Sequence, residues 1–83
     1  MKKIALIGAI LENPDENQKQ FNELISAHKS LVKGRMGLPF DQDGIAVISI
    51  IVAGTMDEIN SLTGKLGRIP NVQVKTAISQ KNI

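Results

Sequence analysis

The chain has 83 residues, a net charge of +2 and no cysteine. This length suits one small domain, so we expect residues 1–83 to fold as a single domain. Without cysteine, neither a disulfide framework nor a thiolate metal site can form. No apolar run approaches the roughly 20 residues of a membrane span, and the basic residues are scattered instead of forming a phosphate-binding stripe. We therefore expect a cytoplasmic protein with no membrane partner and no direct nucleic-acid partner.

The first predicted element is a strand, "KIALIGAIL" (3–11). Two lysines before an apolar run imitate a signal peptide, but the acidic segment that follows offers no small-residue cleavage site. A helix is predicted over about residues 14–29. Asn13 can cap it, Pro14 fits its first position, and Glu16 can close a capping box onto Asn13.

A hairpin is predicted next. The segment "KSLVKGRMGLPF" (29–40) contains two glycines and a proline and suits an edge strand, because proline cannot donate to a strand ladder. The strand itself is predicted over 31–38. The turn residues "DQDG" (41–44) follow. They lead into "GIAVISIIVAG" (44–54), which predicts a strand over 44–53 with aliphatic side chains on both faces.

A second helix begins with a capping box, Thr55 to Glu58. We expect Gly67 to be its C-cap, Pro70 to prevent its return, and Gly64 to allow close packing of helix on sheet. The last strand, "NVQVKTAIS" (71–79), alternates apolar and polar residues.

The element order is βαββαβ. With right-handed crossovers this order gives an α+β ferredoxin-like sandwich, a four-stranded antiparallel sheet with two helices on one face and strand order 4-1-3-2. Only one face of such a sheet is covered by helices. On the third strand, the bulkier set is expected under the helices (Ala46, Ile48, Ile50, Val52).

The outward set of the third strand is the predicted oligomer interface: Ile45, Val47, Ser49 and Ile51. The first strand adds one of its two alternate sets. Burying each aliphatic side chain is worth roughly 1.5–3 kcal/mol, and soluble monomers rarely expose so large a patch. We therefore predict a homo-oligomer, a dimer or a tetramer, packed through the open sheet face. The alternative is that the second strand or the C-terminal tail folds over this face.

The segment "KGRMGLPF" (33–40) holds the candidate ligand site. Arg35, between Gly34 and Gly37, could present its guanidinium and nearby backbone amides to an anionic ligand or a partner. The alternative is an edge-strand bulge, in which both glycines permit special dihedral angles and Pro39 blocks edge pairing.

Catalytic and metal sites are not indicated. His28 is the only histidine and has no ligand partner within the chain, although symmetry could bring copies together. The acidic residues lie mostly in first helical turns, where capping explains them, and no pair suggests a general acid and base. The central strands carry no aromatic residue for stacking bases. We expect no enzyme activity, no metal and no cofactor.

Three segments together carry a family resemblance: the first strand, "GRMGLPF" followed by "GIAVISIIV", and "LTGKLGRIPNVQVKTA". From about Lys3 to Ser79 the chain resembles the iron-only hydrogenase system regulators. The resemblance implies an ACT-like ferredoxin fold, similar in shape to the C-terminal ligand-sensing domain of the nickel-responsive repressor. Such domains assemble through their sheets. The histidines and cysteine that bind nickel in those relatives are represented here by His28 alone.

Two functions remain open from the sequence. The first is a non-enzymatic regulator or sensor domain that acts as a homo-oligomer and binds a small-molecule effector at a subunit interface. The second is a protein–protein interaction module that assists metalloenzyme (hydrogenase) assembly without a small ligand. No DNA-binding segment precedes Met1, so we expect any effect on transcription to pass through a partner.

Overall fold

The computed structural model describes residues 1–83. Four strands and two α-helices follow one another in the order βαββαβ, with one turn of 3-10 helix between the second and third strands. Their bounds are β1 Lys3–Glu12, α1 Pro14–Ala27, β2 Val32–Phe40, β3 Ile45–Gly54, α2 Met56–Gly67 and β4 Val72–Ile78, with the 3-10 turn at Asp41–Asp43.

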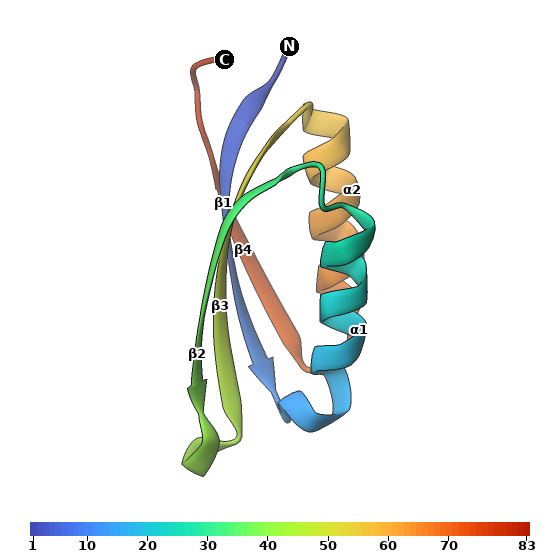
Figure 1. Cartoon of the computed structure of the whole chain (residues 1–83), viewed down its shortest axis with the longest axis vertical. Coiled ribbons are helices and arrows are strands. Elements are labelled where there is room, and N and C mark those ends of the chain that lie inside the picture. The colour runs from blue at the N-terminus through green and yellow to red at the C-terminus, as the bar shows by residue number, and fades with distance from the viewer.

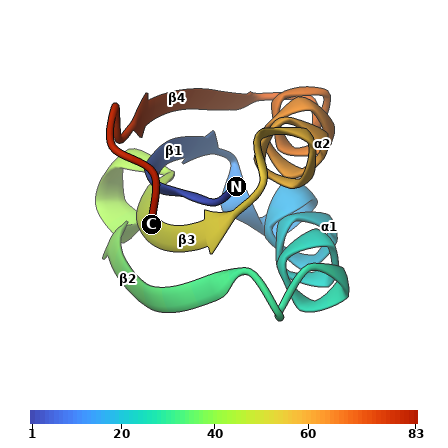
Figure 2. The same cartoon turned by 90° about the horizontal axis from the view of Figure 1, so that it is seen from above.

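The four strands form one antiparallel sheet in the order β2-β3-β1-β4. Both helices lie on the same side of this sheet, and the opposite side carries no element of the chain (Figure 1). Figure 2 shows the same two layers from above, with β2 and β4 at the two edges. The predicted ferredoxin-like sandwich and its strand order are confirmed.

The hydrophobic core lies between the sheet and the helices and contains 16 buried residues. β3 contributes its predicted set, and β1 contributes alternate residues of the same face. The choice that the sequence left open for β1 is therefore settled. The buried side chains of the two central strands are Ala5, Ile7, Ala9 and Leu11 of β1 and Ala46, Ile48, Ile50 and Val52 of β3.

The two ends of the chain lie together at one end of the sheet (Figure 1). The amide of Ser79 donates to the carbonyl of Ile4 at 2.8 Å, and the amide of Ile83 donates to the carbonyl of Lys2 at 2.9 Å. The C-terminal residues thus continue alongside the start of β1. At this end of the sheet the tail crosses from the β4 edge toward β3 (Figure 2), and Ile83 borders a hollow together with Lys33 and Ala53. No tail residue borders the two hollows in the middle of the open face, and β2 lies at the sheet edge.

The two helices begin differently. At α2 the capping box is confirmed: the Glu58 amide donates to Thr55 Oγ1 at 3.2 Å, and the Thr55 amide donates to Glu58 Oε1 at 2.8 Å. At α1 the predicted box is wrong. Asn13 has φ 56°, and its side chain makes no capping bond. A left-handed residue turns the chain directly from β1 into α1, and the Asn13 carbonyl accepts from the Glu16 amide instead.

The end of α2 also differs from the prediction. Gly67 is the last helical residue, but the C-cap is Arg68, in ordinary right-handed conformation. The left-handed residue of this connection is Asn71, with φ 64°, because the reversal comes after Pro70 and not at the helix end. Gly64 does not mediate close packing either, since a Cβ there would meet nothing within 4 Å.

The edge strand β2 carries the expected irregularity. Its pairing with β3 shifts register between Val32 and Gly34, which is a bulge. Neither Gly34 nor Gly37 has a positive φ, so the expected special dihedrals at these glycines are absent. The left-handed glycine of the hairpin is Gly44, with φ 64°, where the 3-10 turn closes into β3.

Candidate functional site

The open face of the sheet carries most of the exposed large apolar side chains of the molecule. Residues that stand opposite each other in an antiparallel pair share a face, so the register defines this surface. Seven of its large apolar side chains each leave 39% to 63% of their surface exposed. They are Ile4, Leu6 and Ile10 of β1, Met36, Leu38 and Phe40 of β2, and Ile51 of β3.

The predicted interface residues all lie on this face. Ile51 is exposed, while Ile45, Val47 and Ser49 are half-buried between neighbouring strands. Their neighbours on β1 and β2, which the sequence analysis did not assign, contribute most of the exposed area. The sequence shows that β1 has two alternate sets of residues, but it does not show which set faces outward. Only the pairing of β1 with its partner strands decides this.

Two shallow hollows lie side by side across the middle of the open face. One, of about 410 Å³, is lined by residues of β1, β2 and β3. The other, of about 310 Å³, is lined by residues of β1, β3 and β4. Leu6 and Ser49 border both. Gly8 and Ser49 are direct cross-strand partners. Their small side chains leave a depression in the surface between larger neighbours.

Arg35 is directed toward the helices and not toward the open face. It pairs with Ile50, which is buried under the helices. Its Nη2 donates to Oδ1 of Asn22 on α1 at 2.6 Å. The guanidinium therefore bridges the edge strand and the first helix at an exposed position.

The three candidate ligand residues are not gathered at one point. Gly34 lies opposite Ile51 on the open face, whereas Gly37 lies opposite Ile48 on the helix side. Arg35 borders the 410 Å³ hollow together with Gly34. It also borders a separate hollow of about 270 Å³ together with Gly37, beside the start of α1.

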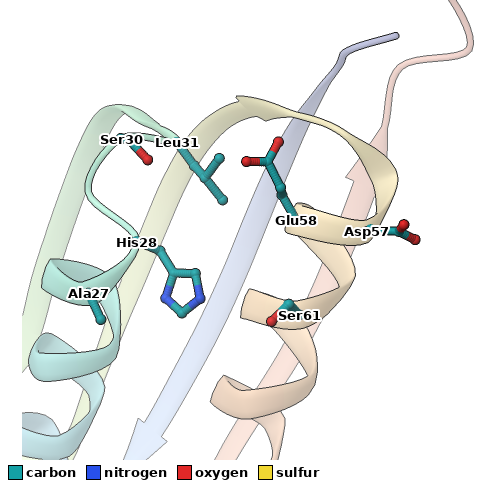
Figure 3. Close-up of a pocket in the computed structure, with 7 residues that line it drawn as sticks. All are labelled: Ala27, His28, Ser30, Leu31, Asp57, Glu58 and Ser61. Carbon is teal, nitrogen blue, oxygen red and sulfur yellow. The ribbon is translucent and has the colours of Figure 1, made fainter.

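A further cleft of about 310 Å³ lies between the C-terminal end of α1 and the N-terminal end of α2. Figure 3 shows the imidazole of His28 projecting into the space between the two helices. Its Nδ1 lies 2.9 Å from the Leu24 carbonyl, so Nδ1 carries the hydrogen in this contact and Nε2 remains available. Asp57, Glu58 and Ser61 border the cleft from α2, but the Asp57 carboxylate points away from His28 (Figure 3).

The polar groups of this cleft are mostly engaged in hydrogen bonds that stabilise the two helices. Hydrogen bonds from the backbone and then the hydroxyl of Thr55, with a smaller effect of Lys2, lower the pKa of Glu58 below its usual value. The carboxylate is thus held by the helix cap. No group of three or more histidine, cysteine, aspartate or glutamate side chains is close enough to hold a metal ion. His28 therefore has no set of ligand partners within one chain.

No helix of this chain has both the length and the apolar character required to cross a membrane. With the apolar sheet face, two helices on the other side and no clustered polar centre, the architecture defines a small domain of the ACT-like, ferredoxin-like class.

Comparison with known proteins identifies the family. The family profile of the TM1266-like proteins, described as proposed iron-only hydrogenase system regulators, matches residues 3–76. The chain therefore belongs to this family. The expected resemblance is confirmed, and the family description supports a regulatory domain.

Solved structures agree with the fold. The uncharacterised protein TM1266 from Thermotoga maritima is 29% identical, with a TM-score of 0.92 over 96% of this chain and 100% of that chain. The ACT domain from GTP pyrophosphokinase of Chlorobium tepidum is 20% identical, with a TM-score of 0.77 over 93% and 100%. The C-terminal domain of MgtC from Mycobacterium tuberculosis is 15% identical, with a TM-score of 0.68 over 98% and 92%. No curated protein matches the chain.

Proposed function

We propose that this chain is a non-enzymatic regulatory domain that works as a homo-oligomer and binds a small effector at a subunit interface. The family to which it belongs supports the regulatory role. The observation that carries the proposal is the apolar open face of the sheet, with its seven exposed large side chains.

The size of this face is that of a functional apolar patch. Full burial of a large apolar side chain removes on the order of 100 Å² from water, so seven that are each about half exposed offer roughly 350 Å² of apolar area. The largest apolar patch of a typical monomer is about 300–600 Å² and is often functional. A stable interface takes about 800 Å² from each partner, so an assembly through this face would also have to cover its half-buried residues.

Arg35 is the proposed anchor for an anionic effector. Its bond to Asn22 is exposed to solvent, so a carboxylate or phosphate could replace the amide oxygen with a charge-assisted pair. Gly34 and Gly37 lie close to Arg35 on the same strand, Gly34 on the open face and Gly37 on the helix side. This position lies beside the open face, where an assembled neighbour would border it.

The test has two parts. Sedimentation velocity from micromolar to millimolar concentration should show a dimer or tetramer, and a monomer throughout would exclude the assembly. A thermal-shift screen over metals, amino acids and nucleotides should then find a stabilising effector. Arg35→Ala should reduce that shift, with Lys33→Ala as the matched loss of a cation on the same strand. An equal shift in both variants would remove Arg35 from the site.

The shallowness of the hollows favours a second candidate, a protein-interaction module that assists hydrogenase assembly without a small ligand. A broad, flat apolar face suits a protein better than a small molecule. Capture of purified hydrogenase maturation components by the chain, together with an empty thermal-shift screen, would favour this function over the first.

A further inference from the structure

The open face contains two neighbouring rows of side chains that run across all four strands. The first row, here the Leu6 row, contains Gly34, Ile51, Leu6 and Ala77 in the order β2, β3, β1, β4. The second, here the Gly8 row, contains Met36, Ser49, Gly8 and Lys75 in the same order. The two rows are successive on the same face, because side chains two residues apart on a strand point the same way.

The rows are opposite in size at every strand. The Leu6 row is small at both edges and large in the middle. The Gly8 row is large at both edges and small in the middle. Strand by strand, the pairs are Gly34 with Met36, Ile51 with Ser49, Leu6 with Gly8, and Ala77 with Lys75.

From this pattern we infer that the partner of the open face is a second copy of this chain, related by a two-fold axis that runs between the two rows. This inference rests on the proposed homo-oligomer and specifies its geometry. Such an axis places the Leu6 row of each subunit over the Gly8 row of the other. In an isologous interface, residue i contacts j while j contacts i, so a self-matching surface needs two adjacent rows that are complementary.

The match fills the hollows of the face. Leu6 of one copy lies over Gly8 of the other, and Ile51 lies over Ser49. Both large central side chains therefore occupy the hollows beside these small residues. At the β2 edge, Met36, which is 63% exposed, lies over Gly34. Large-to-small alternation across facing layers is the pattern that gives close packing in cores.

The charge on these rows agrees with the arrangement. Lys75 is the only charged residue of either row, and it lies at the β4 edge. It faces Ala77 of the other copy and not its own counterpart, so its ammonium can extend past the small side chain to solvent. A charge at the rim with apolar residues at the centre is the usual anatomy of an interface.

The glycine at the centre allows a direct test, because the folded subunit tolerates a side chain there. A Cβ on Gly8 would meet only the Lys75 carbonyl, at 3.8 Å, which is ordinary contact, and Gly8 has no positive φ. Gly8→Leu should therefore fold as the native chain does, while its side chain collides with Leu6 of the other copy. We expect the dimer dissociation constant from sedimentation velocity to rise on the order of 100-fold.

Restoring the alternation should restore the dimer. Leu6→Ala/Gly8→Leu exchanges large and small between the rows, and its dissociation constant should return to within about tenfold of the native value. Ser49→Leu alone and Ser49→Leu/Ile51→Ala repeat the experiment on β3, in case Gly8→Leu fails to fold. Gly37→Leu is the matched control: its added Cβ also makes only contacts of 3.9 Å, but it lies on the helix side.

Each result has one meaning. A native chain that is monomeric at all concentrations overturns the proposed assembly and this geometry with it. A native dimer that neither Gly8→Leu nor Ser49→Leu weakens assembles through another surface. If both single variants dissociate and neither exchange rescues, the open face is used but the rows are not matched as inferred. Rescue by the exchanges, with Gly37→Leu still dimeric, supports the inference.

Discussion

Ile50 and Ile51 are consecutive residues of β3 that lie on opposite faces of the sheet, Ile50 completely buried under the helices and Ile51 47% exposed on the open face. Isoleucine therefore has a different role at each of these two consecutive positions. Ile50 stabilises the subunit, and Ile51 is free for contact with another molecule.

This relationship predicts unequal effects of the same substitution. Ile50→Ala should lower the free energy of unfolding by about 2–5 kcal/mol, because it leaves a cavity in a closed core. Ile51→Ala should change it by about 0.5 kcal/mol or less when measured by urea denaturation at a concentration where the chain is monomeric. Comparable losses in the two variants at that concentration would contradict the assignment of faces.

The cap of α2 predicts a local loss of stability. Thr55→Ala removes the hydroxyl that accepts from the Glu58 amide, and it should cost about 1 kcal/mol of unfolding free energy. Thr63→Ala is the matched control, since that hydroxyl only donates to the Asn60 carbonyl one turn back in the same helix. Alanine favours a helix interior, so the control should be neutral or slightly stabilising.

Glu58 also predicts a dependence on acid pH. Its pKa is lowered in the folded chain by the hydrogen bonds from Thr55, so the folded state favours the carboxylate. The stabilisation is complete above the unfolded pKa of about 4.3. It is lost as the pH falls through the lower folded value.

The variant that isolates this effect is Glu58→Gln, which can still accept from the Thr55 amide but does not titrate. Urea unfolding between pH 7 and pH 2 should show a smaller loss of stability in Glu58→Gln than in the native chain. The difference should develop only below about pH 4.3. Parallel curves for the two proteins would show that the cap does not depend on the charge.

Two glycines predict changes of opposite sign. Gly44 has φ 64° and open space around its Cβ position, so Gly44→Ala should destabilise by about 1–2 kcal/mol through backbone conformation alone. Gly64 lies in α2, also in open space and without a positive φ. Gly64→Ala should stabilise by about 0.5–1 kcal/mol, and thermal unfolding of both variants measures the difference.

Much of the fold could be predicted because local signals agreed with one another. The Thr55–Glu58 cap, the turn after Phe40 and the apolar central strands each marked an element, and chain order with right-handed crossovers left one simple topology. The cap at Asn13 was predicted wrongly. Its residue type fitted a side-chain cap, but the tight passage from β1 into α1 required a left-handed backbone there, and a sequence pattern does not contain that requirement.

The candidate site was less predictable. The outward set of β3 lies on the predicted face. The two sets of β3 are equal in bulk and differ only in Ala46 against Ser49, so the polar Ser49 is the one residue that distinguishes the outward set. Arg35 looked free beside two glycines, yet strand register turns it toward α1, where it meets Asn22. Gly34 and Gly37 are near neighbours in the chain, but the pleat places them on different faces of the sheet.

The sequence by itself determined the element order, the βαββαβ sandwich and the presence of an apolar second face, since these follow from local periodicity and chain connectivity. Only the tertiary structure decided which residues stand side by side on that face. Leu6, Ile51 and Ala77 come from three strands far apart in the chain, and cross-strand register alone brings them into one row beside Gly8 and Ser49. Register depends on the pairing of whole strands, so no single segment of the sequence contains it.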